Sequence, residues 1–303
     1  MRALVWFRRD LRVEDNPALS VAAASGLPIE AVFVYPSSQD APLAEGAAAG
    51  WYLHHSLQAL QQRLSEIGIP LHLLQGTEEA VLPAFCAERS VARFYWNRLV
   101  DPQQELRDKR LQKLLEEDGV SCQSFAEDCL VMPEDARKAD GNPYRVFTPF
   151  WRNLRDRLRG NDLTFRLSSA PQPGGPPVAF SPGAVDALGL LSQHPWYQKL
   201  HAYWEPGELS AQQRLADFID QGLADYADLR ERPDVDGSSR LSAALHFGEL
   251  SVARVYAIVD ELLVQEPEEL ARASMRRFLA EIGWREFARH VMHAFPHTLS
   301  PVS

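Results

Sequence analysis

Short apolar stretches alternate with longer amphipathic ones through the first 130 residues. Runs rich in aliphatic and aromatic residues predict strands at residues 3–7, 29–35, 70–76, 92–97 and 121–125. After the second run, large apolar side chains recur mostly every three or four residues and stop at Gly68, which predicts a helix. They are Trp51, Leu53, Leu57, Leu60, Leu64 and Ile67. This βαβ rhythm predicts an α/β fold with a doubly wound parallel sheet.

The pattern changes in the second half of the chain. The segment "SSAPQPGGPPVAFSPGAVDALGLL" at residues 168–191 is dense in proline and glycine, which excludes long helices. From about residue 210 the periodicity is helical, with no strand-like alternation. We therefore expect an α/β domain at 1–130, a linker at 131–200 and an all-α domain at 201–303.

The loop after the first predicted strand is a candidate ligand site. Doubly wound sheets hold ligands beyond the carboxyl ends of their strands, and the segment "RRDLRVEDNPAL" at residues 8–19 occupies such a position. It contains no G-x-G-x-x-G, so the fingerprint of a dinucleotide-binding turn is absent from it. The loop is expected to lie at a ligand edge without that motif.

Composition and charge narrow the class of protein. The 303 residues are 46% hydrophobic and 24% charged, which is enough for two cores. The apolar stretch near the N-terminus is too short for a secretory signal, so we expect a cytoplasmic location. Cys86, Cys122 and Cys129 show no metal or disulfide spacing and are expected to be reduced. With a formal net charge of −10, any nucleic-acid contact must be local.

The segment "DGSSRLSAAL" at residues 236–245 places hydroxyls and a cation before an apolar helix. Serine side chains are common helix N-caps, so a plain cap is one interpretation. Ser238, Ser239 and Ser242 supply more hydroxyls than one helix start uses, and Arg240 adds positive charge where the helix dipole is already positive. A phosphate-binding loop is therefore the second interpretation, and both stay open on this pattern.

A second segment, "MRRFLAEIGWREFARHVMH" at residues 275–293, combines an apolar helix face with aromatic and charged residues. Glu281, Trp284 and Arg285 fall at i, i+3 and i+4, so they are expected to project together. Between residues 272 and 289 five arginines face two glutamates, a local net charge of +3. The alternatives are a ladder of surface ion pairs beside a core tryptophan, or a local nucleic-acid contact.

Four segments together resemble a known family. They are "VWFRRDLRVEDNPAL" at 5–19, "YRVFTPFWRNL" at 144–154, "SSRLSAALHFGELS" at 238–251 and "EIGWREFARH" at 281–290. In this order they resemble the signature segments of the DNA photolyase/cryptochrome family, most closely the class I cyclobutane pyrimidine dimer photolyases. The resemblance covers essentially the whole chain. It implies an N-terminal α/β domain that can hold an antenna chromophore and a helical domain that binds FAD.

The resemblance also implies roles for individual residues. The FAD site would be formed by Tyr226, Ser238, Ser239, Arg240, Leu241, Ser242 and Phe278. Damaged DNA, with its flipped dimer, would be bound by Arg230, Glu281, Trp284 and Arg285. In the family, reduced FAD absorbs light and gives an electron to the dimer, whose ring opens before the electron returns. No side-chain nucleophile and no metal are expected, and the complete protein is expected to be a monomer.

The sequence departs from the family pattern in two places. Segments of the "TGYP.VDA.MR" and "WMHNR.RM" type do not occur, so the chain resembles a photolyase truncated in its FAD-binding domain. We therefore expect this chain, on its own, to bind FAD weakly or not at all, to show no dimer repair and to expose apolar faces on helices such as 275–293. Gln103 and Gln104 stand where folate-type members have Asn and Glu, which argues against a folate antenna. A deazaflavin, or no antenna, stays open. A cryptochrome-like photoreceptor and a non-catalytic remnant are the alternative functions.

Overall fold

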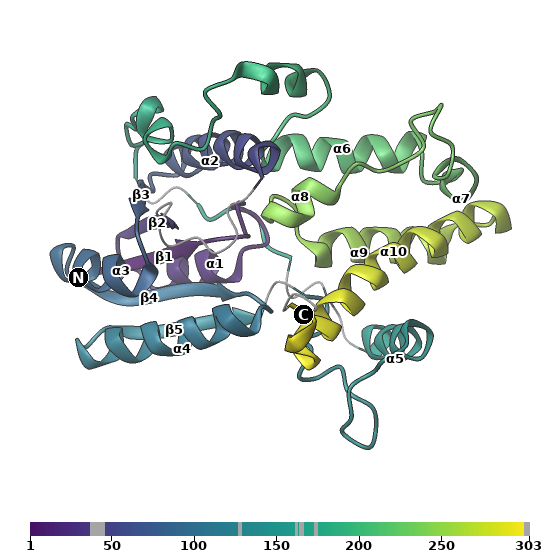
Figure 1. The fold of residues 1–303 in the computed structure, drawn as a ribbon, viewed down its shortest axis with the longest axis horizontal. Coiled ribbons are helices and arrows are strands. Elements are labelled where there is room, and N and C mark those ends of the chain that lie inside the picture. The colour runs from purple at the N-terminus through teal and green to yellow at the C-terminus, as the bar shows by residue number, and fades with distance from the viewer. Residues whose placement is uncertain (37–45, 127–128, 161–162, 164–166, 173–174, 300–303) are drawn as a thin grey trace.

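The structure is a computed structural model. It describes residues 1–303 except 37–45, 127–128, 161–162, 164–166, 173–174 and 300–303. One part of the molecule is built around a sheet and the other from helices (Figure 1).

The sheet has five parallel strands in the order β3-β2-β1-β4-β5. They are β1 (Arg2–Phe7), β2 (Ile29–Tyr35), β3 (Leu71–Gln75), β4 (Val91–Arg98) and β5 (Ser121–Ala126). All five predicted strands are confirmed. The central strand is buried on both faces, because Val5 and Phe7 enter one apolar cluster while Leu4 and Trp6 enter another. The predicted α/β fold class is therefore correct.

The helices around the sheet are α1 (Pro17–Ala24), α2 (Ala47–Glu66), α3 (Glu78–Glu88) and α4 (Pro102–Glu117). Two of them begin with a side-chain cap followed by proline. Asn16 accepts a hydrogen bond from the backbone of Leu19 at 3.1 Å, and Asp101 accepts from Gln103 at 2.8 Å. Proline at the first helical position loses no hydrogen bond, so these local sequences set where the helices begin.

The second part is helical, as predicted. It contains α5 (Phe147–Gly160), α6 (Glu208–Gln221), α7 (Tyr226–Leu229), α8 (Ser242–Phe247), α9 (Val252–Gln265) and α10 (Glu269–Ala294). Short 3-10 segments accompany them: η2 (Pro182–Ala184), η3 (Asp186–Leu188), η4 (Pro195–Ala202) and η5 (Pro296–Leu299). Among the described residues of 168–191 there is no α-helix, as the proline and glycine content indicated.

Helix α5 lies within the expected linker at 131–200, yet it packs into the helical core. Phe150 and Leu154 belong to the same buried cluster as Val255 of α9 and Phe278 of α10. The boundaries at 130 and 200 remain a prediction. Residues 131–200 contribute side chains to the helical core, so this interval is not simply a linker.

The expectation of exposed apolar faces on residues 275–293 is wrong for the main face of α10. Met275, Phe278, Leu279 and Ile282 are all buried. Their cover comes from helices within the chain, because α5, α7 and α9 all contact α10. Of the large apolar residues on α10, Leu270 and Trp284 are exposed.

The loop between β1 and α1, residues 8–16, joins the sheet to the helices. Leu11 donates its backbone N–H to the carbonyl of Phe247 at 3.1 Å, and Arg12 donates to the carbonyl of Gly248 at 2.9 Å. Gly248 has φ +70°, and a Cβ at this position would overlap the carbonyl of Arg9. Only glycine allows so close an approach of the two backbones.

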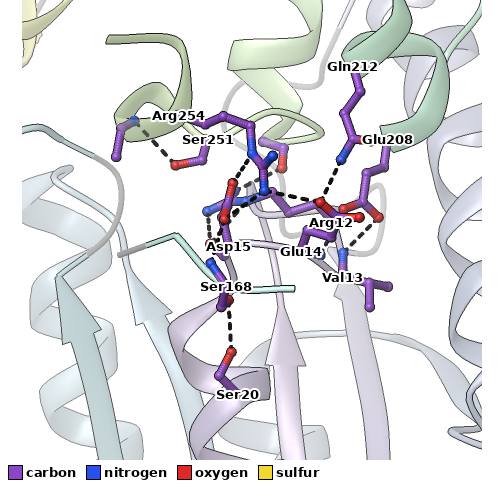
Figure 2. Close-up of polar contacts among 12 residues, drawn as sticks. Arg12, Val13, Glu14, Asp15, Ser20, Ser168, Glu208, Gln212, Ser251 and Arg254 are labelled. Atoms are coloured by element: carbon purple, nitrogen blue, oxygen red, sulfur yellow. Dashed lines mark hydrogen bonds and ion pairs between the residues drawn. The ribbon is translucent and has the colours of Figure 1, made fainter. Parts of the chain in front are cut away.

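Carboxylates complete this junction (Figure 2). Glu208 of α6 accepts hydrogen bonds from the backbone N–H groups of Val13 at 2.9 Å and Glu14 at 2.8 Å. Asp15 is buried, pairs with Arg254 of α9 and accepts from the backbone of Ser168 at 2.8 Å. Residues of the helical part thus bind several polar groups of this loop, and the interpretation of residues 8–19 as a ligand edge stays a prediction.

Glu249, the second residue after α8, is a buried carboxyl that links α2 to the helical part. It accepts hydrogen bonds from the hydroxyls of Tyr52 at 2.7 Å and Ser56 at 2.6 Å, and from the backbone of Gly207 at 2.6 Å. Burial raises the pKa of Glu249 to about 6, because the loss of water around the carboxylate outweighs the three donors.

This shift predicts a pH dependence of stability. The folded protein holds the Glu249 proton more tightly than the unfolded chain, whose glutamates titrate near 4.5. The free energy of unfolding should therefore fall as the pH rises from about 4.5 to about 6, with roughly 2 kcal/mol lost from this group. Urea unfolding of Glu249→Gln across this range should show a flatter profile than the unmodified protein. Glu117→Gln, at an exposed position, should keep the original slope; equal slopes in all three proteins would contradict the assignment.

Candidate functional site

Helix α10 carries four of the predicted site residues: Phe278, Glu281, Trp284 and Arg285. Its position is fixed by its buried apolar face and by Gly283, where a Cβ would overlap the ring of Trp151 on α5. The missing side chain lets α5 lie close against α10. The pairing of these two helices determines what surrounds Glu281 and Trp284.

Glu281 belongs to a compact polar group with residues of α7. Arg230, which follows α7, donates from Nη1 to Glu281 Oε1 at 2.5 Å and to the hydroxyl of Tyr226 at 3.3 Å. Arg277 lies one turn before Glu281 on α10, with its Nε 3.8 Å from Glu281 Oε1. The structure therefore brings Tyr226, Arg230 and Glu281 together, although α7 and α10 are distant in sequence.

Trp284 lies at the surface, with 47% of the residue exposed. Its ring stacks on Phe147, the first residue of α5, with centroids 3.7 Å apart and planes at 8°. Phe287 touches it edge-on at 5.9 Å. The alternative that Trp284 is a core residue is wrong. One face of the indole rests on Phe147, a partner that sequence reasoning did not identify, although "FTPFW" lies within one of the family-like segments.

Arg285 does not project with Glu281 and Trp284, contrary to the spacing argument. Its Nη1 donates to the buried carboxylate of Glu286 at 2.7 Å. It also lines a small cavity of about 20 Å³ together with Arg9 and Arg12 of the junction loop. The physical reason is Glu286, which attracts the guanidinium toward the interior. The predicted ladder of ion pairs on this face is thus reduced to Arg277 and Glu281.

The serine-rich loop before α8 is not a plain helix cap. The residue at the N-cap position is Leu241, and no side chain caps the helix. Ser239 Oγ accepts only from the backbone of Leu241 at 3.4 Å, while Ser238 and Ser242 are exposed and have no hydrogen-bond partner among the described residues. The loop therefore presents free hydroxyls. Phosphate binding by this segment stays a prediction.

Arg240 in the same loop adopts a left-handed conformation with φ +52°. Its Nε lies 3.0 Å from Asp236 Oδ1, and its side chain is 37% exposed. A phosphate would compete with this exposed ion pair at little cost, because surface pairs of this kind contribute about 0–1 kcal/mol. The loop fits the anionic part of a dinucleotide cofactor.

Tyr226 and Phe278, the two aromatic residues expected at a flavin, are buried against each other. Their ring centroids are 5.4 Å apart at 88°, and Phe218 of α6 packs on both. Burial raises the pKa of the Tyr226 phenol, so it stays protonated at neutral pH. Both rings belong to the helical core, and the guanidinium of Arg230 lies over the Tyr226 ring at 5.4 Å.

The three cysteines are at most partly exposed. Cys86 and Cys129 are buried, and Cys122 is half-buried. Within the described ranges, no group of three or more His, Cys, Asp or Glu residues could hold a metal ion. The described helices include none that is both long and apolar enough to cross a membrane.

Comparison with known proteins identifies relatives of the chain. The DNA photolyase family model matches residues 3–174. A deoxyribodipyrimidine photo-lyase of Agrobacterium fabrum is 36% identical over 295 residues, which cover 97% of this chain and 59% of that protein. Cryptochrome-2 of Arabidopsis thaliana is 31% identical, with coverage of 98% and 49%. The chain therefore spans about half to three fifths of the length of these relatives.

A solved structure agrees with the sequence comparisons. The crystal structure of a bacterial class III photolyase from Agrobacterium tumefaciens superposes with a TM-score of 0.85 at 35% identity. The match covers 98% of this chain and 60% of that one. This similarity is to a class III enzyme, so the expectation of a class I photolyase stays a prediction.

Proposed function

Because the chain belongs to the DNA photolyase family, we propose that it serves the light-dependent repair of cyclobutane pyrimidine dimers in DNA. The observation that carries the proposal is the pair Glu281 and Trp284, one turn apart on α10. The indole is half exposed and rigidly stacked on Phe147, and the carboxylate is held by Arg230. Stacking and edge hydrogen bonding are what an extruded base requires.

The residues have distinct tasks in this proposal. The uncovered part of the indole stacks on the pyrimidines, and Phe147 stops the ring from turning away. Glu281 accepts hydrogen bonds from the edge of the dimer, while Arg230 holds the carboxylate in place through its hydrogen bond to Oε1. FAD would be held by the serine-rich loop and, when reduced and illuminated, would supply the electron. Placement of the dimer is thus the main contribution of these side chains.

A cryptochrome-like flavin photoreceptor is the second candidate function. It is favoured by the 31% identity to Cryptochrome-2 over 98% of this chain. The two functions share FAD and differ in their use of damaged DNA. Repair of a thymine dimer under blue light would support the photolyase proposal, and flavin binding without affinity for the dimer would support the photoreceptor.

The first prediction for this proposal concerns the indole. Trp284→Ala should weaken binding to a duplex with one thymine dimer by about 1–3 kcal/mol, the value of one aromatic–base stacking contact. Binding to the intact duplex should change far less, because no base is extruded there. Fluorescence anisotropy with labelled duplexes in the dark would measure both affinities.

A matched control is available for that experiment. Trp196 on η4 is 46% exposed, close to the value for Trp284, and lies outside the proposed site. Trp196→Ala should leave both affinities unchanged. Equal losses in the two variants, or a loss that is the same for damaged and intact DNA, would count against base stacking by Trp284.

The cofactor loop gives a second prediction. Arg240→Ala should lower the affinity for FAD by about 1.5–3 kcal/mol, the range for a hydrogen bond to a charged group. Titration of the chain with FAD, followed by flavin fluorescence, would measure it. Arg232, which pairs with Asp234 at 2.6 Å on the same surface segment, provides the control variant Arg232→Ala. An unchanged affinity for FAD in Arg240→Ala would remove this loop from the cofactor site.

A further inference from the structure

A groove lies between α2 and residues 201–206, the stretch that ends η4 and leads toward α6. Its volume is about 520 Å³, within the range of about 300–1,000 Å³ that is typical of small-molecule sites. Three glutamines, two histidines, two aromatic rings and one glutamate are among its lining residues. None of the lining residues belongs to the serine-rich loop or to α10, so the groove is separate from the site around Trp284.

The charges around the groove favour a cation. Among the described residues that line it, none is Lys or Arg, and the one carboxylate is Glu205. Glu205 is exposed and makes no ion pair with any described residue. Arg63 of α2 pairs instead with Glu66 at 3.1 Å. Arg214 of α6 lies over the ring of Trp204 at 5.8 Å. An anion would therefore meet an unneutralised carboxylate in this groove, whereas a cation would be attracted to it.

Gln61 adds a buried hydrogen-bond acceptor to the lining. Only 3% of this residue is exposed, and its Oε1 accepts no hydrogen bond from any described residue. A buried acceptor without a donor lowers stability, because it has lost its contact with water and gained no partner. A bound molecule that carries an N–H group would supply the missing donor.

His55 provides a further acceptor. Its Nδ1 lies 3.0 Å from Oε1 of Gln58. Because an amide oxygen can only accept, the hydrogen is on Nδ1, and Nε2 of the neutral ring is then an acceptor. Burial lowers the pKa of His55, so the ring is neutral at pH 7. The groove thus combines a carboxylate, an amide oxygen and an imidazole nitrogen, all of which accept hydrogen bonds.

We propose that this groove binds an organic cation with N–H donors, of the alkylammonium or polyamine class. Glu205 neutralises the charge of the ligand, while Gln61 and His55 accept its N–H groups. Trp204 and Phe180, which also line the groove, cover its carbon chain, and aromatic faces attract cations. The inference does not depend on the proposed repair function.

Three probes of equal chain length test which ligand chemistry the groove selects. Hexane-1,6-diamine carries charge and N–H donors, its fully N-methylated analogue carries charge without N–H donors, and hexane-1,6-diol carries no charge. Calorimetric titration of the full chain at pH 7 should show binding of the diamine. The methylated analogue should bind about tenfold more weakly or worse, a loss of about 1.4 kcal/mol, and the diol should not bind. Equal affinities for the diamine and either analogue would overturn the inference.

A substitution of the carboxylate places the ligand in the groove. Glu205→Gln, at an exposed position, should weaken binding of the diamine about 10- to 100-fold, the factor for one hydrogen bond to a charged group. The control Glu117→Gln removes the same charge on α4, where the carboxylate lies 3.8 Å from Lys113. It should leave the affinity unchanged. Equal losses in the two variants would mean that only net charge matters, and would overturn the site.

Gln61→Met separates a role in binding from a role in folding. Methionine is similar in size but lacks the amide oxygen, so affinity for the diamine should fall by a similar factor. The midpoint of urea unfolding should stay the same or rise, because a buried acceptor without a partner is removed. A lower midpoint would show that the amide already serves the fold and would remove Gln61 from the site. If the unmodified chain binds none of the three probes, the inference fails and the proposed repair function is unaffected.

Discussion

The ion pair between Asp15 and Arg254 joins two parts of the molecule that are far apart in sequence. Asp15 is almost fully buried at the end of the loop that follows β1, and Arg254 reaches it from α9. Loss of one partner from a buried ion pair lowers stability by several kcal/mol, because the other charge stays buried and unpaired. Both Asp15 and Arg254 are therefore needed at this contact. Glu208, which accepts two hydrogen bonds from Val13 and Glu14, reinforces the same contact.

The candidate site depends on this junction. The serine-rich loop leads into α8, and α8 ends at Gly248, whose backbone lies against Arg9 and whose carbonyl accepts from Arg12. On the other side, Arg285 and Glu286 fix α10 near the same loop, with Glu286 also accepting from the backbone of Leu130 at 2.6 Å. The serine-rich loop and α10 are thus both positioned beside the loop that follows β1.

Much of the fold could be predicted from the sequence, because the strands and helices follow local rules. The five strands appear as apolar runs, and α1 and α4 begin where an Asx cap precedes a proline. The packing of α5 could not be predicted in this way, since its apolar residues lie in an interval whose later part is rich in proline and glycine. The contacts of the junction loop could not be predicted either, because its charged residues look solvent-facing until α6 and α9 are placed against them.

The site was predictable to a different degree. The resemblance to the family selected Tyr226, Arg230 and Glu281, and the structure brings these three together. Spacing alone misplaced Arg285, because a helical wheel does not show that Glu286 is buried and draws the guanidinium inward. Phe147 was missed because its stacking on Trp284 joins two helices whose relative position is set by Gly283 and Trp151.

The central claim is that the Asp15–Arg254 contact couples the sheet to the helices, and a double-mutant cycle tests it most directly. Asp15→Asn keeps a residue that tolerates the left-handed conformation at this position, φ +51°, and Arg254→Met keeps much of the arginine side-chain volume. Urea unfolding of the four proteins gives the interaction free energy. We predict a coupling of about 1.5–3 kcal/mol, near the upper end for residues in one ion-pair network. Additive effects, with a coupling below about 0.5 kcal/mol, would contradict the account.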